Sequence, residues 1–392
     1  MRVAVLGGKL QGVEAAYLAR KAGWHVVLVD KNPAAPAVGL CDEFYRFDLM
    51  EKDKLLELFG KVDFVVSALE KKDVLDTIYE CACAASVKVV YDPQAYLLSS
   101  SKLESDKLFA ELEVPAPKPW PLCGFPVTVK PSGASGSENV CQVGSQRELD
   151  TLMAQLADKD NWVIQELLTG PSYSLEVAGC SGDYRTFQVT ELAMDEEYDC
   201  KRVLAPSLLP EDKMKQFAEC ALTIARKLDL NGIMDVEVIL HDDKLKVLEI
   251  DARLPSQTLT AVYKSTGVNV LGVLWSGFDR ENEQTYFTAA PARGVIYEHI
   301  KVGGGRIKVC GEHIMGNVGP LHLFKDFFGA DEAISNYSEN NTEWVATLII
   351  TGENRREAWQ RREKVIRAIM DHCGIQEYRD MTPPLLPESQ AF

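Results

Sequence analysis

The sequence predicts a mixed α/β and α+β fold with more than one domain, and three observations carry this prediction. Short apolar runs alternate with helical patterns over residues 1–95, which indicates a parallel sheet with crossover helices. Strands with antiparallel patterning then dominate residues 125–253. The chain has 392 residues, of which 46% are hydrophobic and 26% charged, so it is long enough for two to three ordinary globular domains.

The first 95 residues are predicted to form a Rossmann-like domain. Strands are expected at 3–7, 25–30, 44–48, 63–69 and 87–92, with helices over 11–22 and 72–84. The first strand-to-helix turn has Lys9 at the place where a dinucleotide-binding turn needs glycine, which argues against an NAD-dependent oxidoreductase. We expect instead that Lys9 and the amides of the helix N-terminus bind an anion, either a carboxylate or a phosphate.

The rest of the chain is predicted to mix antiparallel strands with a few helices. A serine run at 99–101 caps a short helix that ends before Pro115, and further helices are expected over 144–158 and 211–228. Strands are expected in 125–140, 162–168, 173–180 and 185–205, and a hairpin joins 233–240 to 244–253. Residues after 291 again mix strands with a helix over 354–372.

Composition narrows the class of protein. The 42 Lys and Arg residues against 58 Asp and Glu residues give a net charge of −16, which disfavours nucleic acid or an anionic membrane surface as a partner. No signal peptide and no run of about 18 apolar residues is visible. The ten cysteines include no C-x-x-C pair, so we expect reduced thiols in a cytoplasmic protein.

Lys130 precedes a loop rich in small residues, PSGASGS. Small side chains leave backbone amides free to surround phosphate oxygens, and a lysine adds a positive charge beside them. Because the lysine comes before the loop, this is not a Walker-type P-loop. Taken alone, the segment is equally consistent with a flexible hairpin tip.

The hairpin 233–253 brings carboxylates together. Pairing its strands around the turn 241–243 places Glu237 near Glu249, and Asp251 shares a face with Glu249. At 4 Å, two like charges repel by about 4 kcal/mol at an effective dielectric of 20, which a divalent cation would relieve. A set of oxygen ligands alone favours Mg²⁺ or Mn²⁺. Asp235 shares the parity of Glu237, and four apolar residues are expected to face the core: Val236, Val238, Val247 and Ile250.

Together, the Lys130 loop and the two-glutamate hairpin resemble the ATP-grasp superfamily over about residues 1–290. The resemblance implies an ATP-grasp fold with a Rossmann-like domain at 1–100, an ATP-grasp domain at 101–290 (small lobe 101–165, large lobe 166–290) and a mixed C-terminal domain at 291–392. It implies nucleotide contacts at Lys102 or Lys107, Lys130, Ser132, Ser135, Gln165, Glu166, Leu167 and Leu168. The metal ligands would be Glu237, Glu249 and Asp251, where Asp251 replaces the family's usual Asn, and Arg253 would lie at the transferred phosphoryl group.

A second departure from the family's pattern occurs at Ser172, where the family commonly has Glu. This leaves two candidates for the acid that binds the ribose, Glu176 and Glu166. The resemblance implies a ligase that forms a C–N bond between a carboxylate and an amine and produces ADP. In such ligases, ATP phosphorylates the carboxylate to an acyl phosphate, which the amine then attacks, while Mg²⁺ bridges the phosphates.

Three segments are also similar to the ligase family of pyrrolysine biosynthesis: GGKLQGVEAAYLARKAG (7–23), DKNP (30–33) and RLPSQT (253–258). That similarity implies (3R)-3-methyl-D-ornithine and L-lysine as substrates, joined through the lysine ε-amine. The activated amino acid would contact Arg253, Ser256, Gln257 and Thr258, with Ser172 nearby. The lysine would contact Leu10, Gln11 and Glu70, and Lys9, Asp30 and Asp48 on the same rim would contact nucleotide or substrate.

Three other readings stay open at this point. The chain could be an ATP-grasp ligase for a different amino acid or a purine intermediate, an oxidoreductase, or a nucleotide-binding partner protein without activity. The sequence also leaves open whether the chain forms a homo-oligomer.

Overall fold

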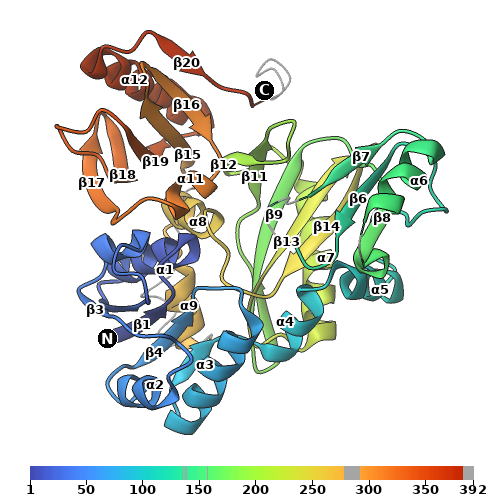
Figure 1. Ribbon diagram of the computed structural model, residues 1–392, viewed down its shortest axis with the longest axis horizontal. Coiled ribbons are helices and arrows are strands. Elements are labelled where there is room, and N and C mark those ends of the chain that lie inside the picture. Colours follow the sequence, from blue (N-terminus) through green and yellow to red (C-terminus); the bar gives the residue numbers. More distant parts are fainter. Residues whose placement is uncertain (135, 137–138, 157, 278–291, 383–392) are drawn as a thin grey trace.

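The computed structural model describes residues 1–134, 136, 139–156, 158–277 and 292–382 (Figure 1). Its N-terminal part is a parallel sheet in the order β3-β2-β1-β4-β5, as the alternating pattern predicts. The strands are β1 (Arg2–Leu6), β2 (His25–Val29), β3 (Glu43–Tyr45), β4 (Phe64–Ser67) and β5 (Lys88–Val90). The helical segments are α1 (Leu10–Lys21), η1 (Pro36–Leu40), α2 (Lys52–Phe59), α3 (Lys72–Ala85) and α4 (Pro93–Ser99).

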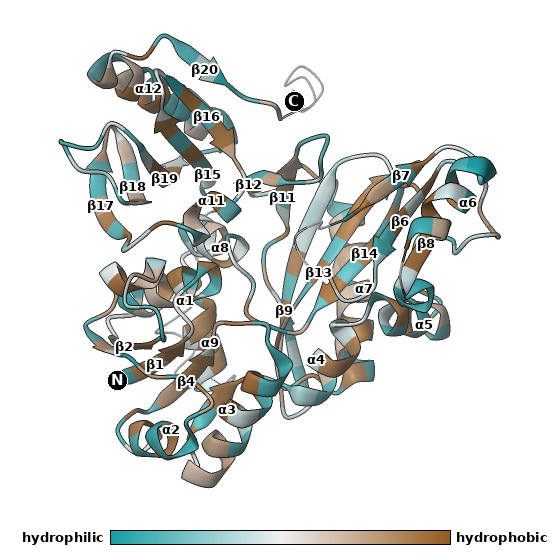
Figure 2. Cartoon of the chain, in the orientation of Figure 1, coloured by the Kyte–Doolittle hydropathy of each residue, from teal (hydrophilic) through white to brown (hydrophobic). Residues whose placement is uncertain are grey.

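Both faces of this sheet are covered, which explains why its strands are apolar throughout. Helices α2 and α3 pack on one face. On the other, α1 is joined by α8 (Thr258–Thr266) and α9 (Val270–Ser276), which come from far along the chain. The Phe64 and Trp275 rings meet edge to face with centroids 5.4 Å apart. Strands β1 and β4 and helix α9 are accordingly among the most hydrophobic segments in Figure 2.

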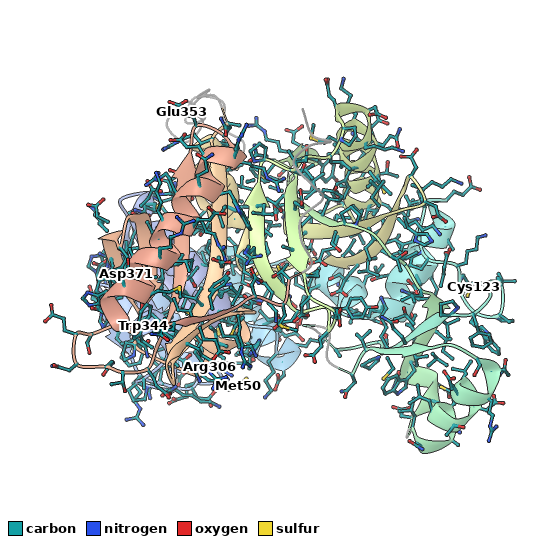
Figure 3. All side chains as sticks on the ribbon, turned by 90° about the horizontal axis from the view of Figure 1, so that it is seen from above. Met50, Cys123, Arg306, Trp344, Glu353 and Asp371 are labelled. Atoms are coloured by element: carbon teal, nitrogen blue, oxygen red, sulfur yellow. The ribbon has the colours of Figure 1, made fainter. Side chains whose placement is uncertain are left out.

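A second, smaller sheet has the order β7-β6-β8 and lies at the far end of the molecule from the C-terminal strands (Figure 1). Figure 3 shows Cys123 of this small lobe on the opposite side of the view from Trp344 and Asp371 of the C-terminal part. The elements of the lobe are α5 (Lys102–Glu111), β6 (Val127–Pro131), β7 (Cys141–Val143), α6 (Gln146–Gln155), η2 (Lys159–Asn161) and β8 (Trp162–Glu166).

Twelve described strands form the largest sheet, along the path β14-β13-β9-β11-β12-β15-β19-β18-β17, with β10 beside β9, β16 beside β15, and β20 beside β16. Its strands before residue 290 are β9 (Ser172–Cys180), β10 (Asp183–Thr186), β11 (Thr190–Met194), β12 (Cys200–Ala205), β13 (Gly232–His241) and β14 (Lys244–Asp251). Those after it are β15 (Gly294–Gly303), β16 (Arg306–Cys310), β17 (His322–Phe327), β18 (Ala330–Ser335), β19 (Trp344–Gly352) and β20 (Glu377–Arg379). Helices α7 (Glu211–Leu228), α11 (His313–Gly316) and α12 (Arg355–Cys373) complete the fold.

The large sheet runs through two of the predicted domains. Strand β12 pairs with β15 from Arg202↔Glu298 to Ala205↔Val295. The buried Glu298 carboxylate binds the guanidinium groups of both Arg202 and Arg362, so the junction is held by charge as well as by the ladder. The predicted division at 290/291 itself falls outside the described residues, and the boundaries stay a prediction.

The hairpin of β13 and β14 pairs as predicted, with Glu237 opposite Glu249. A bulge follows, because Val238 pairs with Val247 and leaves an extra residue in β14. This extra residue lets both Val247 and Ile250 reach the core, although strict alternation would place Val247 on the same face as Glu249.

Over the described part of the chain, no helix is long and apolar enough to cross a membrane.

Candidate active site

Three neighbouring strands, β9, β13 and β14, carry rows of acidic residues across the large sheet. Glu237 lies between Ser174 on β9 and Glu249 on β14. The next row consists of Glu176, Asp235 and Asp251 in the same strand order. Residues two apart along a strand share a face, so these side chains point to the same side of the sheet.

Crowding of these carboxylates favours their protonated forms. Burial, together with the neighbouring Glu249, raises the pKa of Glu237 to about 7. Burial also raises the pKa of Asp251 to about 7, against the opposing effect of Arg253. Burial and the charge of Asp251 hold the pKa of Asp235 well above its usual value. A divalent cation would stabilise the charged forms, and this oxygen-only set fits a hard cation such as Mg²⁺.

The three predicted metal ligands do not converge into one cluster. In the described ranges, no group of three or more His, Cys, Asp or Glu side chains is arranged to hold a metal ion. Two of the three carboxylates instead contact cationic side chains. Lys102 Nζ lies 3.0 Å from Glu249 Oε2, and Arg253 Nη2 lies 2.8 Å from Asp251 Oδ2. Glu237 and Glu249 face each other across the hairpin.

Lysines from the small lobe face this pair. Lys130, at the end of β6, is only 5% exposed. Burial lowers the pKa of the Lys130 ammonium, while the charges of Glu249 and Glu237 oppose that shift. Of the two lysines proposed in α5, Lys102 lies in the site, whereas Lys107 is exposed and pairs with Glu104 at 2.7 Å. The geometry does not bring Lys107 together with the other predicted residues.

The loop after Lys130 is tied to the start of α5. Ser132 accepts a hydrogen bond from the Lys102 amide through its carbonyl at 3.0 Å, and its hydroxyl lies 3.2 Å from that of Ser101. Lys102 Nζ donates to the Ala134 carbonyl at 2.6 Å. Lys102 thus links the loop to Glu249. The predicted nucleotide contact Ser135 lies outside the described residues.

The predicted nucleotide contacts at 165–168 lie where β8 ends. Gln165 and Leu168 are buried, and Leu167 and Glu166 are half-buried. Glu166 Oε2 accepts from Lys246 Nζ at 2.6 Å. Burial works against ionisation, but this hydrogen bond holds the pKa of Glu166 below its usual value.

The second candidate for the ribose, Glu176, is fully buried. Burial raises its pKa to about 7, so a large part of Glu176 is protonated near neutral pH. Of the two, Glu166 at the end of β8 is the more exposed acid.

A second group of predicted residues gathers around Arg253. Its Nε lies 2.9 Å from Glu70 Oε1, and Gln11 Nε2 donates to the same oxygen at 3.0 Å. The Tyr96 hydroxyl donates to the Glu70 carbonyl and holds that segment at the carboxyl end of β4. Burial disfavours the charge of Arg253, but Asp251 and Glu70 outweigh this and raise its pKa. The guanidinium therefore joins the acidic rows to the edge of the N-terminal sheet.

Ser256, Gln257 and Thr258 lie at the N-terminus of α8, next to Arg253 in sequence. Gln257 has a left-handed φ of 75°, which is strained for a non-glycine residue and is typical of functional sites. Its side chain contacts the buried His299, whose Nε2 lies 3.2 Å from Gln257 Oε1. Ser172, by contrast, pairs with Ile239 on the other side of the Glu237 row, away from Ser256–Thr258.

The remaining rim residues do not converge on one point. Asp30 accepts a hydrogen bond from the Gly8 amide at 2.7 Å, which fixes the first turn. Lys9 is exposed, and Asp48 accepts from the Met50 amide at 3.0 Å in a separate exposed turn. Leu10 packs near Gly316 of α11.

Glu312, which precedes α11, was missed by the sequence reasoning. Burial raises its pKa, and hydrogen bonds with Ser256 and Gln257 and the charge of Arg253 partly offset this. It thus faces the predicted amino-acid pocket from the C-terminal part of the chain. No pattern around position 312 signals this role, because its partners lie more than 50 residues away.

The chain is similar to known proteins over most of its length. A family model for the ATP-grasp domain matches residues 99–257, and one described as "PylC-like, N-terminal domain" matches residues 3–90. The 3-methyl-D-ornithine–L-lysine ligase of Methanosarcina barkeri is 34% identical over 377 residues, covering 95% of this chain and 98% of that protein. The ligase of the same name from Methanosarcina acetivorans is 34% identical, with the same coverage.

Solved structures share the fold at low identity. The ADP complex of N5-carboxyaminoimidazole ribonucleotide synthetase has a TM-score of 0.68 and 14% identity, covering 95% of this chain and 97% of that one. The L-amino acid ligase from Bacillus licheniformis has a TM-score of 0.66 and 15% identity, covering 94% and 97% respectively. These likenesses confirm the predicted ATP-grasp fold.

Proposed function

Because the chain belongs to the ATP-grasp carboxylate–amine ligases, in the family of the 3-methyl-D-ornithine–L-lysine ligases, we propose that it joins these two amino acids in pyrrolysine biosynthesis. The product would be the amide between the carboxylate of (3R)-3-methyl-D-ornithine and the ε-amine of L-lysine. The observation that carries the proposal is the placement of Arg253. It contacts Asp251 of the β13–β14 hairpin on one side and Glu70 of the predicted lysine site on the other.

In the first step, a carboxylate oxygen of the ornithine attacks the γ-phosphorus of ATP, the bond to the bridging oxygen breaks, and ADP leaves. Lys130, Lys102 and Arg253 would stabilise the charge on the phosphoryl oxygens in this step. Glu237 and Glu249 would hold Mg²⁺, which supplies charge neutralisation on the phosphates.

In the second step, the lysine ε-amine, once deprotonated, attacks the carbonyl carbon of the acyl phosphate. The C–O bond to phosphate breaks, and inorganic phosphate leaves. Glu70 and Gln11 would orient the lysine through hydrogen bonds to its ammonium groups, because an acidic rim favours a dibasic amino acid. Burial of the centre would keep water from the acyl phosphate.

Purified protein with ATP, Mg²⁺, 3-methyl-D-ornithine and L-lysine tests this proposal. We expect ADP release that requires both amino acids, and a product with the mass of their sum less one water. ADP release that ignores both amino acids would contradict it. Turnover with a different amine or a purine intermediate instead would identify another ATP-grasp ligase activity.

A further inference from the structure

Helix α8 has an N-terminus that its own residues do not cap. The N-cap position is held by Gln257, which has a φ of 75° and whose side chain makes no capping hydrogen bond. The amide of Thr260, at the third helical position, is the one that an N-cap side chain normally satisfies. Here the acceptor comes from α1, because Thr260 N donates to Glu14 Oε1 at 2.5 Å.

Glu14 lies on α1, which also carries residues of the predicted lysine site. Leu10 and Gln11 precede Glu14 by four and three positions, so all three lie along one side of the helix. Glu14 is 1% exposed, and its second oxygen, Oε2, has no hydrogen-bond partner among the described residues. The Glu14 side chain therefore connects α1, which carries Gln11, to the first turn of α8, which begins at Thr258.

The opposite ends of the same two helices are joined by a different acid. Glu332 of β18 binds the Tyr17 hydroxyl and Lys21 Nζ of α1, and its Oε2 lies 3.1 Å from Lys264 Nζ of α8. This contact joins α1 to α8 at the helix ends that lie away from the predicted pocket. The general docking of the two helices thus does not depend on Glu14 alone.

We propose that Glu14 is a positioning residue of the amino-acid pocket: by capping α8 from α1, it fixes the spacing between the Gln11–Glu70 side and the Ser256–Thr258 side. The two sides would bind the two substrates, so their spacing sets the distance between the acyl carbon and the attacking amine. The inference rests on the proposed function and names a residue that acts through Ser256–Thr258 rather than on substrate itself.

Four variants test the inference: Glu14→Met removes the acceptor, Glu14→Asp shortens its reach, Glu14→Gln keeps it, and Glu332→Gln is the matched control. We expect Glu14→Met and Glu14→Asp to raise KM for both amino acids about fivefold and to leave KM for ATP within about twofold, since a lost cap is worth about 1 kcal/mol. Glu14→Gln should restore both values. Glu332→Gln should lower Tm without this split.

Three outcomes would overturn the inference. The Glu14 variants could change KM for ATP as much as KM for the amino acids, or Glu14→Gln could fail to restore these values. Glu332→Gln could also raise KM for the amino acids without raising KM for ATP. Hydrogen exchange of the Thr260 amide separates this result from a failure of the proposed function. If the wild type does not join the two amino acids, the function fails. The positioning role then stands only if Glu14→Met and Glu14→Asp speed hydrogen exchange of the Thr260 amide while Glu14→Gln and Glu332→Gln do not.

Discussion

Lys102 and Lys107 lie on the same short helix. Replacing each lysine with methionine tests whether only Lys102, which lies beside Glu249, contributes to nucleotide binding. The Lys102 side chain is 13% exposed and lies 3.0 Å from Glu249, whereas that of Lys107 is 72% exposed and contacts Glu104. Methionine keeps most of the apolar stem and removes the charge. Lys107→Met is therefore a matched control for Lys102→Met.

The size of the effect follows from the contacts that each lysine makes. A charge-assisted hydrogen bond in a partly buried site contributes about 1.5–3 kcal/mol, so Lys102→Met should weaken nucleotide binding about 10- to 100-fold. An exposed pair such as Lys107–Glu104 contributes about 0–1 kcal/mol to stability, and its loss should leave binding within about twofold. Titration calorimetry with Mg²⁺ and ADP, together with KM for ATP, measures both. Equal losses in the two variants, or no loss in Lys102→Met, would refute the assignment of Lys102.

Three further predictions concern the metal pair, a buried histidine and a close backbone approach. Glu249→Gln should abolish turnover and weaken Mn²⁺ binding at least about 100-fold, measured by electron paramagnetic resonance; unchanged Mn²⁺ affinity would remove the metal role. Burial lowers the pKa of His299 to about 3. Between pH 6.5 and 3, the imidazole is therefore protonated only in the unfolded chain. The free energy of unfolding then falls on the order of 1 kcal/mol per pH unit as the pH drops through that window. His299→Gln should flatten the urea-unfolding profile there, and an unchanged slope would contradict this. A Cβ at Gly39 would lie 2.1 Å from the Leu321 carbonyl oxygen, so Gly39→Ala should cost about 1–3 kcal/mol in urea unfolding, whereas Gly124→Ala, with open space around it, should cost little.

Local patterns predicted the elements of this fold well. The parallel sheet and the hairpin with Glu237 opposite Glu249 follow from apolar periodicity and turn residues. The bulge in β14 could not be predicted, because one extra residue leaves no signature in the alternation. It is nevertheless what places Val247 in the core.

Contacts that depend on how whole elements pack could not be predicted from the sequence. Lys102 and Lys107 lie five positions apart and so point to different sides of their helix, and only the packing of α5 decides which of them faces Glu249. Glu14 and Thr260 are 246 positions apart, and β12 pairs with β15 across a predicted domain boundary. Such pairings depend on how whole elements pack, which a single sequence does not encode locally.

The transfer of oxygen from substrate to phosphate tests the central claim most directly. The amino acid that we propose is activated, 3-methyl-D-ornithine, is labelled with ¹⁸O in its carboxylate and incubated with ATP, Mg²⁺, L-lysine and the protein. Attack of the carboxylate on ATP predicts that each inorganic phosphate released carries one ¹⁸O atom, detected by mass spectrometry or ³¹P NMR. Amide formation with unlabelled phosphate would contradict the acyl-phosphate route.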